Sequence, residues 1–202
     1  MTRETARPDP PAMRVLLVDD GSPHVPMLCD EVARLGCEVV GVVDAAVELA
    51  ATVARLNPDL IIIGADSPQR DTLENIAVVT RQSPRPIVLF TDDPDRERMQ
   101  RAIRAGVSSY VVAGLAPARL GPVLDVALAR FEADAALRAE LEATRGELAA
   151  RKRIEKAKGI LMQTRGIDEE AAYRELRKLA MDRGIKLIEV ADRIIDAKAL
   201  LS

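Results

Sequence analysis

Five short apolar segments alternate with amphipathic segments in the first half of the chain, and this alternation restricts the fold more than any other feature. The apolar segments read MRVLLVDD (13–20), CEVVGVV (37–43), DLIIIG (59–64), PIVLF (86–90) and SYVV (109–112). Runs of this length, rich in Val, Ile and Leu, are typical of parallel strands that are buried on both faces. The sequence therefore predicts an α/β domain over residues 13–121, with a doubly wound, flavodoxin-like, five-stranded parallel sheet.

The segments between these strands have the period and the boundary residues of helices. We expect helices over 25–35, 45–56, 71–82 and 94–105. Asp44 and Asp93 are the expected N-caps of the second and the fourth helix, and Pro94 would be the first helical residue of the fourth. Asp71 and Glu74 have capping-box spacing at the start of the third.

In a sheet of this type, functional groups gather at the carboxyl ends of the strands. The residues at these ends are Asp19, Asp20, Gly64, Thr91 and Ala113. The motifs VLLVDD, PDLIIIGADSP, IVLFT and RAGVSSYVV resemble those of a response-regulator receiver domain over about residues 13–130. A receiver transfers a phosphoryl group to an aspartate that ends the third strand, beside an acidic pair that holds Mg²⁺.

The resemblance implies a degenerate phosphoacceptor pocket. Asp19 and Asp20 match the acidic pair and Thr91 the hydroxyl group, but Gly64 takes the acceptor position and Ala113 the lysine position. We therefore expect a pseudo-receiver that contacts other proteins and is not phosphorylated. Weak Mg²⁺ binding at the acidic pair is the one metal possibility that remains, and no cofactor is expected. Asp66, on the loop beyond the third strand, is an alternative acceptor.

The heptad spacing of residues 122–150 predicts a long linker helix with a coiled-coil seam. Its seam positions are Leu124, Leu128, Phe131 and Ala135, followed after a shift of phase by Leu137, Leu141, Thr144 and Leu148. A homodimer through this seam is the favoured interpretation, and an amphipathic helix packed on its own domain is the alternative. Pro122 predicts a kink or a late helix start, and Gly146 predicts a weak point.

The last part of the chain, residues 151–202, is basic and divides into three helical segments. It carries thirteen Lys and Arg against nine Asp and Glu, a net charge of +4, whereas the whole chain has −3. Gly166 and Gly184 mark two helix ends, and Asp168 is the expected N-cap of the middle helix. Such charge asymmetry indicates two halves with different functions.

The pattern IExAKGILM (154–162), RGI (165–167), EAAYRxLR (170–177), AM (180–181) and VA (190–191) resembles the ANTAR domain, a three-helix RNA-binding module of transcription antitermination regulators. The stretches ADSPQRDTLENIAVVTRQSPRPIVLF and IRAGVSSYVVAGLAPARL are similar to the NasT-like branch, which controls nitrate and nitrite assimilation. The resemblance implies binding to leader RNA with hairpins. It also implies control by a ligand-sensing regulatory protein.

Lys and Arg side chains can neutralise RNA phosphates, and an aromatic ring can stack on an unpaired loop base. The candidate RNA-binding residues are Arg151, Lys152, Lys156, Lys158, Arg165, Tyr173, Arg174, Arg177 and Lys178. Lys158 leads this set because it lies beside the small residues Ala157 and Gly159, where RNA could approach the backbone. For Tyr173, its place in the AAY run favours core packing over stacking.

Two other functions compete with RNA binding. A DNA-binding helix-turn-helix needs a basic or polar start to its recognition helix, but the last helix begins IKLIEVADRI. A pure adaptor dimer would not need the positive charge. The sequence offers no nucleophile with a base and no glycine-rich phosphate loop, so we do not expect an enzyme. Residues 1–12 predict a disordered leader, and the lack of a signal peptide or an apolar membrane span predicts a cytoplasmic protein.

Overall fold

A computed structural model describes residues 12–45, 47–112 and 119–200 of the chain. The predicted leader, apart from residue 12, and Ala113 lie outside the described residues. The chain divides into two compact units, Met1–Asp134 and Ala135–Ser202, each with its own apolar core.

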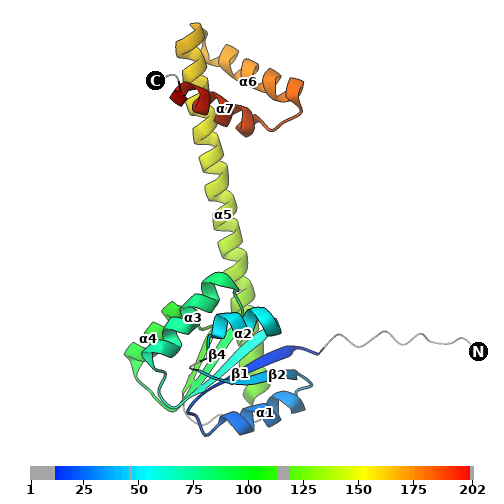
Figure 1. Cartoon of the computed structure of the whole chain (residues 1–202), viewed down its shortest axis with the longest axis vertical. Helices are drawn as coiled ribbons and strands as arrows, with labels where there is room; N and C mark the ends of the chain where they lie inside the picture. The colour runs from blue at the N-terminus through cyan, green and yellow to red at the C-terminus, as the bar shows by residue number, and fades with distance from the viewer. Residues whose placement is uncertain (1–11, 46, 113–118, 201–202) are drawn as a thin grey trace, which may run out of the picture. The chain divides into compact units, whose positions relative to one another are not determined.

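The first unit contains a five-stranded parallel sheet of strand order β2-β1-β3-β4-β5 (Figure 1). The strands are β1 (Arg14–Asp20), β2 (Glu38–Asp44), β3 (Leu60–Ala65), β4 (Ile87–Thr91) and β5 (Ser109–Val112). The helices of this unit are α1 (Val25–Arg34), α2 (Leu49–Leu56), α3 (Arg70–Gln82), α4 (Arg96–Ala105) and the first turns of α5 (Leu120–Arg165). The predicted doubly wound α/β fold is confirmed.

Both faces of the sheet are covered, which is why its strands are apolar throughout. Leu16 and Val18 of β1 pack in a core with α2, α3 and α4. Val15 and Leu17, the residues that alternate with them, pack in a second core with α1 and the start of α5. Successive side chains of a strand point to opposite faces, so each apolar strand supplies both cores.

The predicted start of α2 is wrong. Asp44 ends β2 instead of capping a helix, and α2 begins only at Leu49, after Glu48. The backbone N–H of Ala45 donates to the carbonyl of Asp19 at 2.9 Å. This bond extends the pairing of β2 with β1, so Ala45 is held by the sheet and cannot begin the helix.

The predicted starts of α3 and α4 are also displaced. α3 begins at Arg70, so Asp71 lies inside its first turn and no capping box forms. The N-cap of α4 is Asp95, whose carboxylate accepts from the backbone N–H groups of Glu97 and Arg98 at 2.7 and 3.3 Å. Asp93 accepts from the N–H of Asp95 at 2.9 Å, so Asp93 supports the N-cap residue but is not itself the N-cap.

α5 is one continuous helix of 46 residues. It begins before Pro122, so this proline lies in the first turn. The N–H groups of a first turn have no carbonyl partner within the helix, so the N–H that proline lacks is not needed there. Gly146 does not interrupt the helix. The expected late start is therefore wrong, and the linker helix and the first helix of the C-terminal segment are one element.

The second unit consists of the later turns of α5, α6 (Glu169–Arg183) and α7 (Leu187–Leu200). Small and branched residues form its core: Ala157, Leu161, Ala172, Leu176, Ala180, Val190 and Ala191. Gly166 and Gly184 adopt positive φ angles of 66° and 62° at the two turns. The carboxylate of Asp168 accepts from the N–H of Ala171 at 2.7 Å, which confirms it as an N-cap. None of the helices in the described ranges is long and apolar enough to cross a membrane.

Candidate regulatory pocket and nucleic-acid interface

Asp19, Asp20, Gly64 and Thr91 meet at the carboxyl edge of the sheet, as the sequence predicts. Asp19 lies opposite Gly64 in the pairing of β1 with β3, and Thr91 ends the neighbouring strand β4. Within the described residues, no group of three or more His, Cys, Asp or Glu side chains is placed to hold a metal ion.

The polar side chains of this pocket are engaged by the protein itself. Asp19 accepts from the backbone N–H of Ser22 at 3.1 Å, and Asp20 accepts from the hydroxyl group of Thr72 at 2.7 Å. The Thr91 hydroxyl donates to the carbonyl of Asp66 at 2.9 Å and accepts from the N–H of Asp93. Thr91 is only 3% exposed. Its hydroxyl group thus fixes the loops after β3 and β4 and is not presented to a ligand.

The space above Gly64 is filled. A Cβ atom at this position would lie 2.7 Å from Cγ2 of Val25 and 3.2 Å from Cβ of Ser22. Carbon atoms in contact lie about 3.5–4.0 Å apart. The pocket therefore lacks both the acceptor side chain and the room for one.

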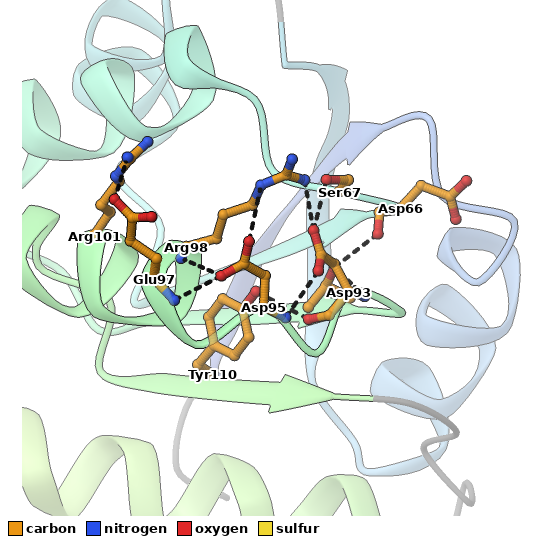
Figure 2. A network of polar contacts seen from close by, with 9 residues as sticks. Asp66, Ser67, Asp93, Asp95, Glu97, Arg98, Arg101 and Tyr110 are labelled. Carbon is orange, nitrogen blue, oxygen red and sulfur yellow. Dashed lines mark hydrogen bonds and ion pairs between the residues drawn. The ribbon is translucent and has the colours of Figure 1, made fainter.

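Asp93 is the centre of a polar network that the sequence did not reveal (Figure 2). Its carboxylate accepts from the hydroxyl group of Ser67 at 2.8 Å and from the guanidinium group of Arg98 at 2.5 Å, and its carbonyl accepts from the hydroxyl group of Tyr110. The N–H of Asp95, the Ser67 hydroxyl and the Arg98 charge together hold the pKa of Asp93 below its usual value. Asp66, the alternative acceptor, is exposed, and its side chain points away from this network (Figure 2).

The predicted RNA-binding side chains do not form one free basic face. Lys158, the leading candidate, is only 7% exposed and lies 2.8 Å from Glu155 and 2.7 Å from Glu169. Arg165 pairs with Glu175, and Arg174 pairs with Glu170 at 3.2 Å. In the described part of the chain, the candidates that are exposed and lack an ion pair are Arg151, Lys152, Lys156, Arg177 and Lys178.

Lys158 instead joins α5 to the first turn of α6. The hydrogen bonds that the Lys158 ammonium donates to the carboxylates of Glu155 and Glu169 raise the pKa of Lys158, and Lys158 lowers the pKa of Glu169. The Lys158 ammonium also lies 6.0 Å from the centre of the Tyr173 ring, within range of a cation–π contact. Tyr173 is 42% exposed, so its expected place in the core is wrong, and the ring is accessible for stacking.

An open groove of about 770 Å³ lies beside this contact. Its apolar lining includes Ala150, Ile154 and Leu187. Its polar lining consists of Glu147, Arg151, Glu155, Lys158, Glu169, Glu170 and Tyr173. Four carboxylates and two cations make the groove acidic, in contrast to the net positive charge of the segment that forms it.

These features define a receiver-type regulator with a closed phosphorylation pocket and a basic helical output module. The family model described as "ANTAR domain" matches residues 142–195. The chain is 28% identical to the transcriptional regulatory protein PdtaR of Mycobacterium tuberculosis over 183 residues, which cover 91% of this chain and 89% of PdtaR. It is also 42% identical over 64 residues to the nitrate regulatory protein of Klebsiella oxytoca, covering 32% of this chain and 16% of that protein.

Two of the similar solved structures are receiver domains, and they share the parallel α/β fold of the first unit. The signal receiver domain of a modulated diguanylate cyclase from Desulfovibrio desulfuricans G20 is 25% identical, with a TM-score of 0.53 over 61% of this chain and 98% of that domain. A CheY-like receiver domain from Methanospirillum hungatei JF-1 has the same TM-score and the same coverage at 19% identity. The chain therefore combines a receiver-like domain with an ANTAR domain that matches over residues 142–195.

Proposed function

We propose that this protein is an RNA-binding transcription antitermination regulator that acts on hairpin leader RNA through its ANTAR domain. The observation that carries the proposal is a set of exposed cations on α5 and α6 that have no ion pair with any residue the structure describes: Arg151, Lys152, Lys156, Arg177 and Lys178. Cations of this kind bind phosphates with a salt-dependent affinity. The exposed ring of Tyr173 supplies a surface on which a loop base can stack.

Control comes from a regulatory protein and not from aspartyl phosphorylation. The filled space above Gly64 and the internal bonds of Asp20 and Thr91 support this part of the proposal. The target genes are those of nitrate or nitrite assimilation. This assignment is supported by the likeness of 64 residues to a protein named for nitrate regulation.

The active form is a homodimer through α5. Leu137, Leu141 and Leu148 are 63%, 46% and 55% exposed in the single chain, although they have the spacing of a coiled-coil seam. A helix in a protein gains most of its stability from packing of its apolar face, so this exposed stretch of α5 favours a partner surface. A dimer would also present two ANTAR domains to two hairpins.

A salt titration tests the nucleic-acid partner. We expect binding to a two-hairpin leader RNA to be stronger than binding to a DNA duplex of equal length. The Lys156→Ala and Arg177→Ala variants should each reduce the dependence of log K on log salt by about one unit or slightly less per contact. Equal affinity for the RNA and the duplex would contradict the proposal and favour a DNA-binding regulator.

A further inference from the structure

The exposed seam of α5 continues into the acidic groove of the ANTAR domain. All residues from 132 to 149 are exposed in the single chain, and Leu137, Leu141, Thr144 and Leu148 mark the seam. The same alternation of four and three residues leads on to Arg151, Glu155 and Lys158, which line the groove. A second helix packed along this seam would therefore extend beyond Leu148 and reach the groove.

The charges of the groove indicate a cationic occupant. Glu155 and Glu169 already bind Lys158. Glu147 has no ion pair among the described residues, and Glu170 pairs only with Arg174, at the exposed surface. A polyanion such as the RNA backbone would be repelled by these carboxylates, whereas a Lys or Arg side chain of a neighbouring helix would be attracted.

The residues that flank the seam show how a second copy would lie. Glu140 and Glu147 occupy one flank, and Arg145 and Lys152 occupy the other. In a parallel, in-register pair of helices, the acidic flank of each copy faces the basic flank of its partner. An antiparallel pair would instead bring acid against acid and base against base. The charge pattern therefore favours a parallel pair.

We propose that α5 of a second copy covers the acidic groove and that its Lys152 enters the groove beside Glu147, with each copy completing the groove of the other. This inference rests on the homodimer included in the proposed function. It assigns Lys152 and the neighbouring Arg151 to the contact between copies. Lys156, Arg177 and Lys178 then remain for RNA phosphates, because they are exposed and belong neither to the groove lining nor to the seam and its flanks.

Charge reversal in the full chain tests the arrangement by sedimentation equilibrium. Glu147→Lys and Lys152→Glu should each replace two attractive contacts by two repulsive ones and weaken the dimer by about tenfold. An equimolar mixture of the two variants should recover the affinity of the original chain, because both contacts become attractive again. Lys156→Glu, the same charge change on the same helix but off the seam, is the matched control and should not alter the dimer. An unchanged dimer in Lys152→Glu, or a mixture that does not recover, would overturn the inference.

A cross-linked dimer separates this contact from RNA binding. In a Cys29→Ala/Cys37→Ala background, Leu148→Cys on the seam should form a disulfide between copies, and Gly146→Cys on the outer face should not. Within the Leu148→Cys dimer, Lys152→Glu should leave the RNA affinity and its salt dependence unchanged, whereas Lys156→Glu should reduce both. A loss of RNA affinity in the cross-linked Lys152→Glu dimer would make Lys152 an RNA contact and overturn the inference. If no form binds RNA, the proposed function fails, but the sedimentation result stands on its own.

Discussion

Replacing Gly64 with aspartate should destabilise the receiver domain and should not create a phosphorylation site. The new Cβ would lie 2.7 Å from Cγ2 of Val25 and 3.2 Å from Cβ of Ser22. Overpacking of this kind costs about 1–3 kcal/mol. A carboxylate would add a further cost, because it would be buried next to Asp19, its pairing partner across the sheet.

The assay combines calorimetric unfolding with mass measurement after incubation with acetyl phosphate and Mg²⁺. For a domain of this size, the steric cost alone corresponds to a fall in the melting temperature of about 4–12 °C. No variant with Val25 intact should gain a phosphoryl group. Gly64→Ala isolates the steric part and should lower the melting temperature without adding a charge.

The double variant Val25→Ala/Gly64→Asp tests whether the contact with Val25 causes the destabilisation. Removing Cγ2 of Val25 removes the shorter of the two contacts, so the double variant should be more stable than Gly64→Asp even though Val25→Ala alone is destabilising. This non-additivity is the expected sign of two side chains that compete for one space. A Gly64→Asp variant with the original melting temperature and efficient phosphorylation would refute the reasoning.

Three further predictions concern other polar contacts. Asp168→Ala should cost about 1 kcal/mol in the free energy of unfolding of the C-terminal unit, measured by chemical denaturation, because α6 loses its N-cap bond. Because Lys158 lowers the pKa of Glu169, the stability from this pair is present above pH 4.5 and is lost as the pH falls through the lowered pKa. Because the pKa of Lys158 is raised, its contribution is complete below pH 10.5 and is lost at higher pH. Both losses should be absent from denaturation curves of Lys158→Met. Ser67→Ala should raise the pKa of Asp93 toward its usual value, as followed by NMR titration, because one of the bonds to its ionised form is removed.

The strands and their topology were predictable because each is specified by its own residues. The alternation of Leu16 and Val18 with Val15 and Leu17 supplies two cores, and this pattern can be read without tertiary information. The helix ends at Gly166 and Gly184 were predictable for the same reason, since a glycine with positive φ terminates a helix locally.

The helix starts were less predictable because several residues compete to begin each helix. Two acids flank Pro94, and the choice of Asp95 over Asp93 depends on Arg98 of α4 and on Ser67 from the loop after β3, which both hold the Asp93 carboxylate. Asp44 does not cap a helix because the next backbone N–H, that of Ala45, is bonded to the carbonyl of Asp19 in the sheet. Local sequence identifies the candidates but not the tertiary contacts that choose among them.

In the candidate site, too, the sequence identifies the residues but not the tertiary contacts that they make. The loss of the acceptor at Gly64 is visible in the sequence, but the closure of its pocket is not, because the obstructing side chain comes from Val25 on α1. Likewise, the positive charge of the C-terminal segment is a property of its composition. Whether a given lysine is free depends on contacts between helices, and Lys158 is bound by Glu169 of α6.

The number of free cations sets a limit on the salt dependence of RNA binding. Of the predicted contact residues, five are cations that are exposed and unpaired within the described residues. A single-stranded loop gives a slope of log K against log salt of about −0.7 for each phosphate neutralised. Five contacts would therefore give about −3.5 per copy, whereas the three that remain if Arg151 and Lys152 lie between copies would give about −2. Fluorescence anisotropy over a range of salt concentrations measures this slope directly on the dimer. A slope near −2 per copy fits the assignment of Arg151 and Lys152 to the contact between copies. A slope steeper than −3.5 would require phosphate contacts from cations other than these five.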